Sequence, residues 1–99
     1  MQQLTPIWRV QDQQLVCHLS VFPTEEQVQQ WRECLRKTDT IRIIEHVEGA
    51  DRQLIRLAFQ NAEFLLFLEY TCEACWIEAS HVEGEKYLPD LRTELQKVC

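Results

Sequence analysis

Short runs in which apolar and polar residues alternate make up most of the chain, and this pattern predicts β-strands. The most apolar run, Phe64–Leu68, lies in the middle of a region that predicts three strands folded back on one another, at Arg52–Gln60, Glu63–Thr71 and Ala74–Ser80. Three more strands are predicted at Leu4–Val10, Gln14–Val21 and Thr40–Val47. The middle of the chain is therefore expected to form the centre of a sheet.

Two other segments show the three- and four-residue spacing of amphipathic helices. The first begins after Thr24, with Gln27 at the spacing of a capping box. Its apolar stripe consists of Val28, Trp31 and Leu35. The second helix is C-terminal, and its stripe consists of Tyr87, Leu88, Leu91, Leu95 and Val98.

The 99 residues have material for one hydrophobic core, so we expect a single α+β domain over residues 1–99. Short connections predict a mainly antiparallel sheet of five or six strands, with two helices packed on one face and the order ββαββββα. A two-residue turn at Asn61-Ala62 would pair Phe59 with Phe64.

The strand over Phe64–Tyr70 is apolar on both sides, which is typical of a strand covered twice. Leu65, Phe67 and Trp76 are expected to share the face opposite the helices, with Glu69 and Glu78 as a polar rim. This patch predicts homodimerisation through the sheet. The alternative is that Arg56 and other long side chains lie across the patch within one chain.

The charge balance limits the classes of partner. The chain has 10 Lys and Arg against 16 Asp and Glu, a formal net charge of −6, which argues against nucleic-acid binding. Between Arg56 and Lys86 every charged residue is acidic. This interval predicts either a negative surface that steers a basic protein partner or an ordinary solvated face.

No Gly-rich phosphate loop and no ordered catalytic constellation is visible, so we predict no catalytic residues and no cofactor. The leading hypothesis is a small acidic protein-binding module, an adaptor or an inhibitor-like protein, without catalytic activity. Met1–Pro6 lacks the features of a signal peptide, and no apolar run is long enough to span a membrane. We therefore expect a cytoplasmic location.

The pair Cys72 and Cys75 supports the alternative hypothesis of a thiol redox or zinc-binding protein. A zinc site needs two more ligands, and no second pair of this spacing exists. Acidic neighbours such as Glu73 would disfavour the thiolate that redox chemistry needs. The five cysteines are an odd number in a chain without an export signal, so reduced thiols are expected rather than a disulfide framework.

The segment Glu69–Glu78, which contains Cys75-Trp76-Ile77 and precedes a helix, resembles a family of small bacterial proteins of unknown function. The resemblance covers the C-terminal half of the chain. It implies a stand-alone bacterial protein and implies nothing about activity.

Overall fold

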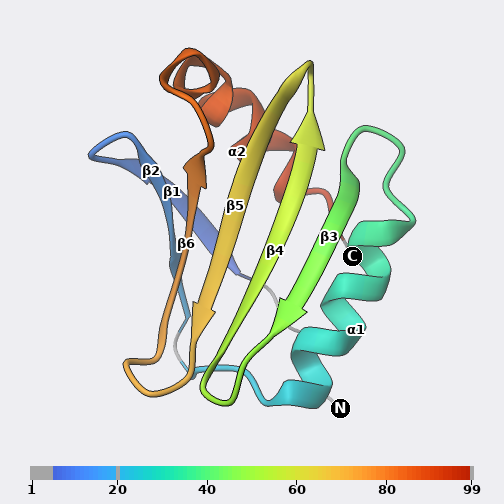
Figure 1. The fold of residues 1–99 in the computed structure, drawn as a ribbon, viewed down its shortest axis with the longest axis vertical. Helices are drawn as coiled ribbons and strands as arrows, with labels where there is room; N and C mark the ends of the chain where they lie inside the picture. Colours follow the sequence, from blue (N-terminus) through green and yellow to red (C-terminus); the bar gives the residue numbers. More distant parts are fainter. Residues whose placement is uncertain (1–5, 20, 99) are drawn as a thin grey trace.

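The computed structural model describes residues 6–19 and 21–98, and it consists of a six-stranded sheet with two α-helices (Figure 1). Every pair of neighbouring strands is antiparallel. The predicted α+β class and the order ββαββββα are confirmed, with a 3-10 helix added before the last helix. The elements are β1 (Ile7–Gln11), β2 (Gln14–His18), α1 (Glu25–Arg36), β3 (Arg42–Glu48), β4 (Arg52–Phe59), β5 (Ala62–Glu69), β6 (Ala74–Ala79), η1 (Val82–Tyr87) and α2 (Leu88–Leu95).

The strands lie in the order β1-β2-β6-β5-β4-β3. Strands β3 to β6 form a meander of consecutive hairpins, and the N-terminal hairpin joins it where β2 pairs with β6. Figure 1 shows α2 passing behind the strands and α1 lying beside β3. One broad face of the sheet is therefore directed away from α2.

Helix α1 begins where the sequence predicts, because its capping box forms. Thr24 Oγ1 accepts a hydrogen bond from the Gln27 amide at 3.2 Å, and Gln27 Oε1 accepts one from the Thr24 amide at 2.9 Å. Glu25 and Glu26 in the first turn complement the positive end of the helix dipole. These local interactions fix the helix start independently of the rest of the fold.

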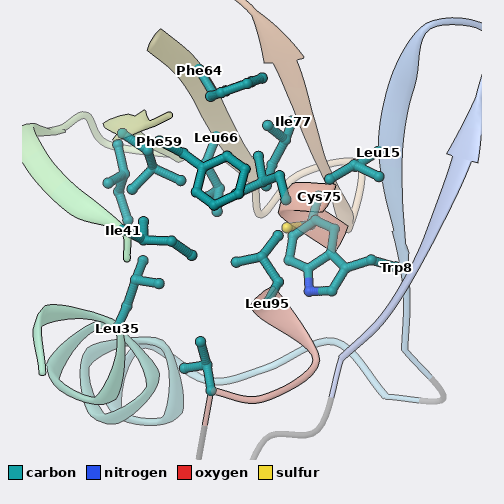
Figure 2. Packing of buried hydrophobic residues seen from close by; sticks show 14 of the residues in the cluster. Trp8, Leu15, Leu35, Ile41, Phe59, Phe64, Leu66, Cys75, Ile77 and Leu95 are labelled. Atoms are coloured by element: carbon teal, nitrogen blue, oxygen red, sulfur yellow. The ribbon is translucent and has the colours of Figure 1, made fainter. Parts of the chain in front are cut away.

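The core lies between the helices and one face of the sheet. Figure 2 shows Leu35 and Leu95 pointing from the two helices toward the side chains of the sheet. Burial of this apolar surface supplies the main driving force for folding, at about 25 cal/mol per Å². The buried residues that form it are Trp8, Leu15, Val28, Trp31, Leu35, Ile41, Ile55, Leu57, Phe59, Phe64, Leu66, Leu68, Cys75, Ile77, Leu88, Leu91, Leu95 and Val98.

The two edge strands are protected in different ways. At β1, the Trp8 amide donates a hydrogen bond to Gln96 Oε1 at 3.0 Å, and Arg92 Nε donates one to the Trp8 carbonyl at 2.6 Å. At β3, the pairing register shifts between Ile43 and Glu45, which marks a bulge. Both devices hinder pairing of an edge with a strand of another chain.

Strand ends differ from the sequence prediction at several points. Strand β2 ends at His18 rather than Val21, which is 79% exposed, because the chain leaves the sheet there to reach the cap of α1. The segment Val82–Tyr87 forms the 3-10 helix η1, so α2 begins only at Leu88, after the Tyr87 that the sequence assigns to its stripe. Leu4, at the start of the first predicted strand, lies outside the described residues.

The turn between β4 and β5 is Gln60-Asn61, so the predicted turn at Asn61-Ala62 is wrong. Both turn residues have positive φ, 49° and 66°, as a type I′ turn requires. Phe59 consequently pairs with Ala62 instead of Phe64. The pairing moves by two positions along the partner strand, so the same side chains still face the core.

We expect Trp31→Ala to lower the free energy of unfolding by about 3–5 kcal/mol, because the loss of a buried indole leaves a cavity. Trp31 is 5% exposed, and its ring centroid lies 6.2 Å from that of Trp8. Chemical denaturation measures the change. Trp31→Phe is the control: it keeps an aromatic ring and removes an indole nitrogen that has no hydrogen-bond partner in the described part of the chain, so its cost is smaller. Equal stability of the Trp31→Ala protein and the parent would contradict this packing.

Candidate interaction surface

The sheet face away from the helices, called here the open face, carries an apolar row that crosses five strands. Val16 of β2 pairs with Trp76 of β6, which pairs with Phe67 of β5. Phe67 pairs in turn with Leu54 of β4, and Leu54 pairs with Val47 of β3. Val47 is exposed and the others are half-buried. Among the described elements both helices pack on the opposite face, so the row is open to a binding partner.

Two aromatic side chains form the centre of this row. The rings of Phe67 and Trp76 stack, with centroids 5.0 Å apart and an interplanar angle of 17°. Trp76 Nε1 donates a hydrogen bond to Glu78 Oε1 at 2.9 Å, which fixes the orientation of the indole. Leu65 lies in the next row, between Glu78 and Arg56. Rigid aromatic groups flanked by polar ones are typical of the energetic centre of a protein interface.

Charges on the open face are balanced. Arg52 and Glu69 form an ion pair at 3.6 Å, and Arg56 and Glu45 form another at 3.6 Å. The register places on this face the arginines Arg9, Arg42, Arg52 and Arg56 and the glutamates Glu45, Glu63, Glu69 and Glu78. Their formal charges cancel, so the net charge of −6 belongs to the rest of the molecule.

This balance changes the meaning of the acidic interval seen along the sequence. Glu69 on β5 has Arg52 of the neighbouring strand as its register partner, and Leu65 lies between Glu78 and Arg56. Arg52 and Arg56 belong to β4, which precedes the acidic interval in the sequence. Folding therefore mixes the two signs of charge across strands and produces no negative field on the open face.

All five predicted interface residues lie on the open face: Leu65, Phe67, Trp76, Glu69 and Glu78. Sequence reasoning missed Val16, Leu54 and Val47, which extend the apolar row to both sides. The signal that could have found them is alternation, since Leu54 and Arg56 share the side of β4 opposite Ile55. Arg56 pairs with Glu45 toward β3 and does not cover the aromatic stack.

The Cys72 and Cys75 pair is split by the fold. Cys72 is exposed in the turn between β5 and β6, whereas Cys75 is buried on the core face of β6. Within residues 6–19 and 21–98, no group of three His, Cys, Asp or Glu side chains is arranged to hold a metal ion. Cys17, Cys72 and Cys75 are free thiols as expected, but Cys34 is disulfide-bonded, so the expectation of reduced thiols is wrong for that residue.

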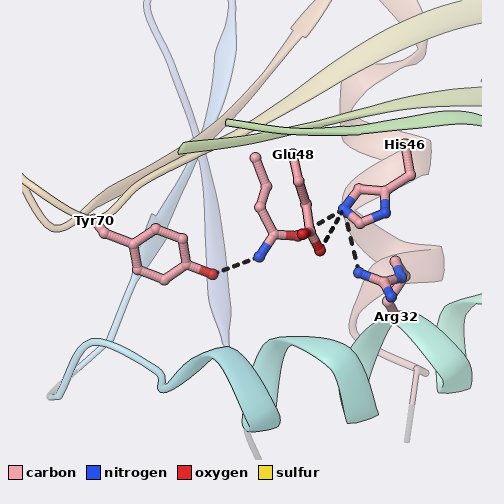
Figure 3. A network of polar contacts seen from close by, with 5 residues as sticks. Arg32, His46, Glu48 and Tyr70 are labelled. Atoms are coloured by element: carbon pink, nitrogen blue, oxygen red, sulfur yellow. Dashed lines mark hydrogen bonds and ion pairs between the residues drawn. The ribbon is translucent and has the colours of Figure 1, made fainter. Parts of the chain in front are cut away.

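A polar network lies on the opposite face of the sheet, at the edge of the core between the strands and α1 (Figure 3). Gln53 is its centre and is only 6% exposed. Its Nε2 donates a hydrogen bond to the Tyr70 hydroxyl at 2.6 Å, and its Oε1 lies 2.7 Å from His46 Nε2. That histidine nitrogen also lies 3.2 Å from Arg32 Nη1 and 3.8 Å from Glu48 Oε1.

His46 Nε2 carries either one proton or one lone pair, so it donates to Gln53 or Glu48 or accepts from Arg32. In the donating tautomer it pairs with Gln53 Oε1, and Gln53 Nε2 is left to donate to the Tyr70 hydroxyl. This arrangement satisfies both polar ends of the buried Gln53 amide, as a buried polar group requires. The network is therefore a structural element that closes the core at this edge.

Tyr70 does not supply a catalytic base to this network. Burial raises the pKa of Tyr70, and the Glu25 and Glu48 carboxylates raise it too, while the hydrogen bond with Gln53 lowers it in part. The phenol consequently stays protonated at neutral pH. Its ring also meets Phe22 edge to face, with centroids 5.6 Å apart.

Comparison with known proteins gives a family and no activity. The model of a family described as "Protein of unknown function (DUF3630)" matches residues 7–93. The chain belongs to this family. No curated protein and no solved structure matches it. In the described part of this DUF3630 protein, neither helix has the length and apolar character to cross a bilayer.

We expect Gln53→Leu in this DUF3630 protein to lower the free energy of unfolding by about 1–3 kcal/mol, because it leaves the half-buried polar groups of His46 and Tyr70 without this partner. It should also raise the pKa of Tyr70 further, since the hydrogen bond from Gln53 lowers it. Chemical denaturation and titration of tyrosinate absorbance measure the two effects. Gln30→Leu on the exposed side of α1 is the control and should change neither.

The same titration fixes the sign of the pH dependence. The pKa of Tyr70 is raised above its usual value of 10.0 in the folded chain. Its contribution to stability is therefore fully present below pH 10 and is lost as the pH rises through the folded pKa. A fall in the pKa of Tyr70 on Gln53→Leu substitution would contradict this account of the network.

Proposed function

We propose that this protein is a non-catalytic protein-interaction module, and that the partner on its open face is a second copy of the same chain. The observation that carries the proposal is the uninterrupted apolar row, centred on the Phe67 and Trp76 stack, on the one broad face that no described helix covers. The protected edges of β1 and β3 disfavour assembly by strand addition. The remaining mode of assembly is face-to-face packing of the two sheets.

Two-fold symmetry suits the distribution of side chains. An axis running along β5, in the plane between two packed sheets, places β4 of one copy over β6 of the other. Phe67 then meets its own counterpart, and Leu54 meets Trp76 of the second copy. The apolar rows of the two chains lie one on the other.

The same operation makes the charges complementary. Arg56 on β4 and Glu78 on β6 flank Leu65 at the same level of the sheet, so Arg56 of each copy is placed over Glu78 of the other. Glu69 would approach its counterpart, but each is paired with Arg52 of its own chain at 3.6 Å. A neutral face also avoids the repulsion that two chains of charge −6 would otherwise feel.

The size of the face predicts a dimer of moderate affinity. Six strands about 4.8 Å apart and three rows of side chains give a face of roughly 24 Å by 20 Å. Two such faces remove roughly 1,000 Å² or more from water, which is at the lower end of specific interfaces. We expect a dissociation constant in the micromolar range.

The alternative of a basic partner has less support from the geometry. The hypothesis depends on a continuous negative surface from Glu63 to Glu85, but Glu63, Glu69 and Glu78 share the open face with four arginines. A partner that covers this face need not be basic. A second copy supplies both signs of charge in the required places.

We expect Phe67→Glu to convert the dimer into a folded monomer, raising the dissociation constant at least about 100-fold, because it places an unpaired carboxylate at the centre of the interface. Light scattering over a concentration series measures the mass, and thermal melting shows whether the variant is folded. Val82→Glu is the matched control, since Val82 is 70% exposed on η1, away from this face. A parent chain that stays monomeric at millimolar concentration would exclude the dimer.

A charge exchange tests the orientation of the two copies. We expect Arg56→Glu and Glu78→Arg each to weaken the dimer about tenfold, and the double variant to recover most of the loss, because the pair is restored across the interface. The measurement is the same concentration series for the three proteins. Additive losses in the double variant would exclude the two-fold axis along β5.

A further inference from the structure

A pair of thiols that are distant in sequence comes together on the core side of the sheet. The β2 and β6 register pairs Leu15 with Ile77 and Val16 with Trp76, and one further step places Cys17 opposite Cys75. Leu15 and Ile77 are both buried on the helix side, and alternation puts the two cysteines on that same side. Opposite residues of antiparallel strands have Cα atoms about 4.5–5.5 Å apart, within the range that a disulfide spans.

The two side chains interact directly. A hydrogen bond with the Cys17 thiol raises the pKa of Cys75 well above its usual value, and burial raises it further. Both cysteines are free thiols. The Cys75 thiol is therefore the one that burial keeps protonated.

Solvent reaches the two sulfurs unequally, and Cys17 is the more accessible of the two. A recess of about 470 Å³ opens beside the pair and is lined by both cysteines together with His18, Phe22 and Glu73. Cys17 is half-buried, whereas Cys75 is only 7% exposed. Glu73 at this recess disfavours anionic oxidants such as glutathione disulfide, so a small neutral peroxide is the reagent that the site admits.

We propose that Cys17 and Cys75 form a reversible disulfide when the protein meets hydrogen peroxide. The Cys17 thiolate attacks one peroxide oxygen, the O–O bond breaks, and a sulfenic acid and one water form after proton transfer. The Cys75 sulfur then attacks the Cys17 sulfur, the S–O bond breaks, and the second water leaves with the Cys75 proton. Two thiols and one peroxide give one disulfide and two waters, and a dithiol reductant reverses the change.

The competing partner for Cys75 is Cys72, three residues earlier, and the fold separates these two. Cys72 lies in the exposed turn, and Glu73 beside it has a positive φ of 52°. The Cys75 side chain enters the core from the first part of β6. The cysteine whose thiol interacts with that of Cys75 is Cys17.

The bond has a definite structural effect. The β2 and β6 register contains three residue pairs, fewer than any other neighbouring pair of strands in the sheet. A Cys17–Cys75 disulfide extends this junction by a covalent link and ties the N-terminal hairpin to the central meander. The open face lies on the other side of the sheet, so oxidation leaves the apolar row unchanged.

The experiment oxidises the fully reduced full-length chain with a small excess of hydrogen peroxide, alkylates the remaining thiols and digests with trypsin. Cleavage after Arg9, Arg32, Arg56 and Lys86 places Cys17 in one peptide, Cys72 and Cys75 together in a second, and Cys34 apart from both. We expect the first two peptides to be joined in the parent and in Cys72→Ser, and to be separate in Cys17→Ser and Cys75→Ser. Dithiothreitol should release them.

A stability measurement gives a second readout. Since the Cys34 disulfide also reforms on oxidation, Cys17→Ser is the reference. Oxidation should raise the urea midpoint of the parent and of Cys72→Ser by more than it raises that of Cys17→Ser. Three results would overturn the proposal: a Cys72–Cys75 bond within the single peptide, alkylation of Cys17 and Cys75 in the oxidised parent, or conversion of Cys17 to sulfinic acid without pairing.

Discussion

The burial of β5 between its neighbours is the constraint on which the rest of the structure depends. Phe64 and Leu66 on its core side are fully buried. The pairing of β5 with β4 is the longest in the sheet, and its pairing with β6 contains six residue pairs. Both helices pack on the side that these residues define, and the N-terminal hairpin contributes Trp8 and Leu15 to the same core. The opposite side of the same strand, with Leu65 and Phe67, is apolar as well, and residues 6–19 and 21–98 supply no third layer to cover it. A sheet with two apolar sides and one set of helices is the physical origin of the open face.

Local interactions made much of the fold predictable. The start of α1 follows from Thr24 and Gln27, whose reciprocal hydrogen bonds need no tertiary partner. The stripes of both helices and the alternating strands also follow from sequence spacing. The turn at Gln60-Asn61 was misplaced by one residue because a positive φ at a glutamine is not signalled by residue type. The bulge near Ile44 was missed for a similar reason, since the run of isoleucines reads as one regular strand.

Features created by strand pairing could not be obtained from the sequence. The five predicted interface residues were assigned to one face by alternation, but the row that Val16, Leu54 and Val47 complete depends on strand order and register. The same holds for charge, because Arg52 and Glu69 are far apart in the chain and 3.6 Å apart in the fold. The spacing of Cys72 and Cys75 predicts a two-cysteine motif, whereas in the fold the thiol of Cys75 interacts with that of Cys17. Sequence proximity is a poor guide to which side chains meet in a sheet of this topology.

The hydrogen bonds between α2 and β1 have a consequence for how the chain acquires its structure. The Trp8 amide and carbonyl are held by Gln96 and Arg92, 88 and 84 residues later in the chain, and β2 finds its second partner only in β6. During synthesis, the N-terminal hairpin therefore cannot gain these partners until the chain through Gln96 has left the ribosome. Until then, Trp8 and Leu15 have no complete core to pack into, and their side chains stay exposed to solvent or bound by a chaperone. The meander from β3 to β6 depends on nearest neighbours in sequence, and it is the part able to form first.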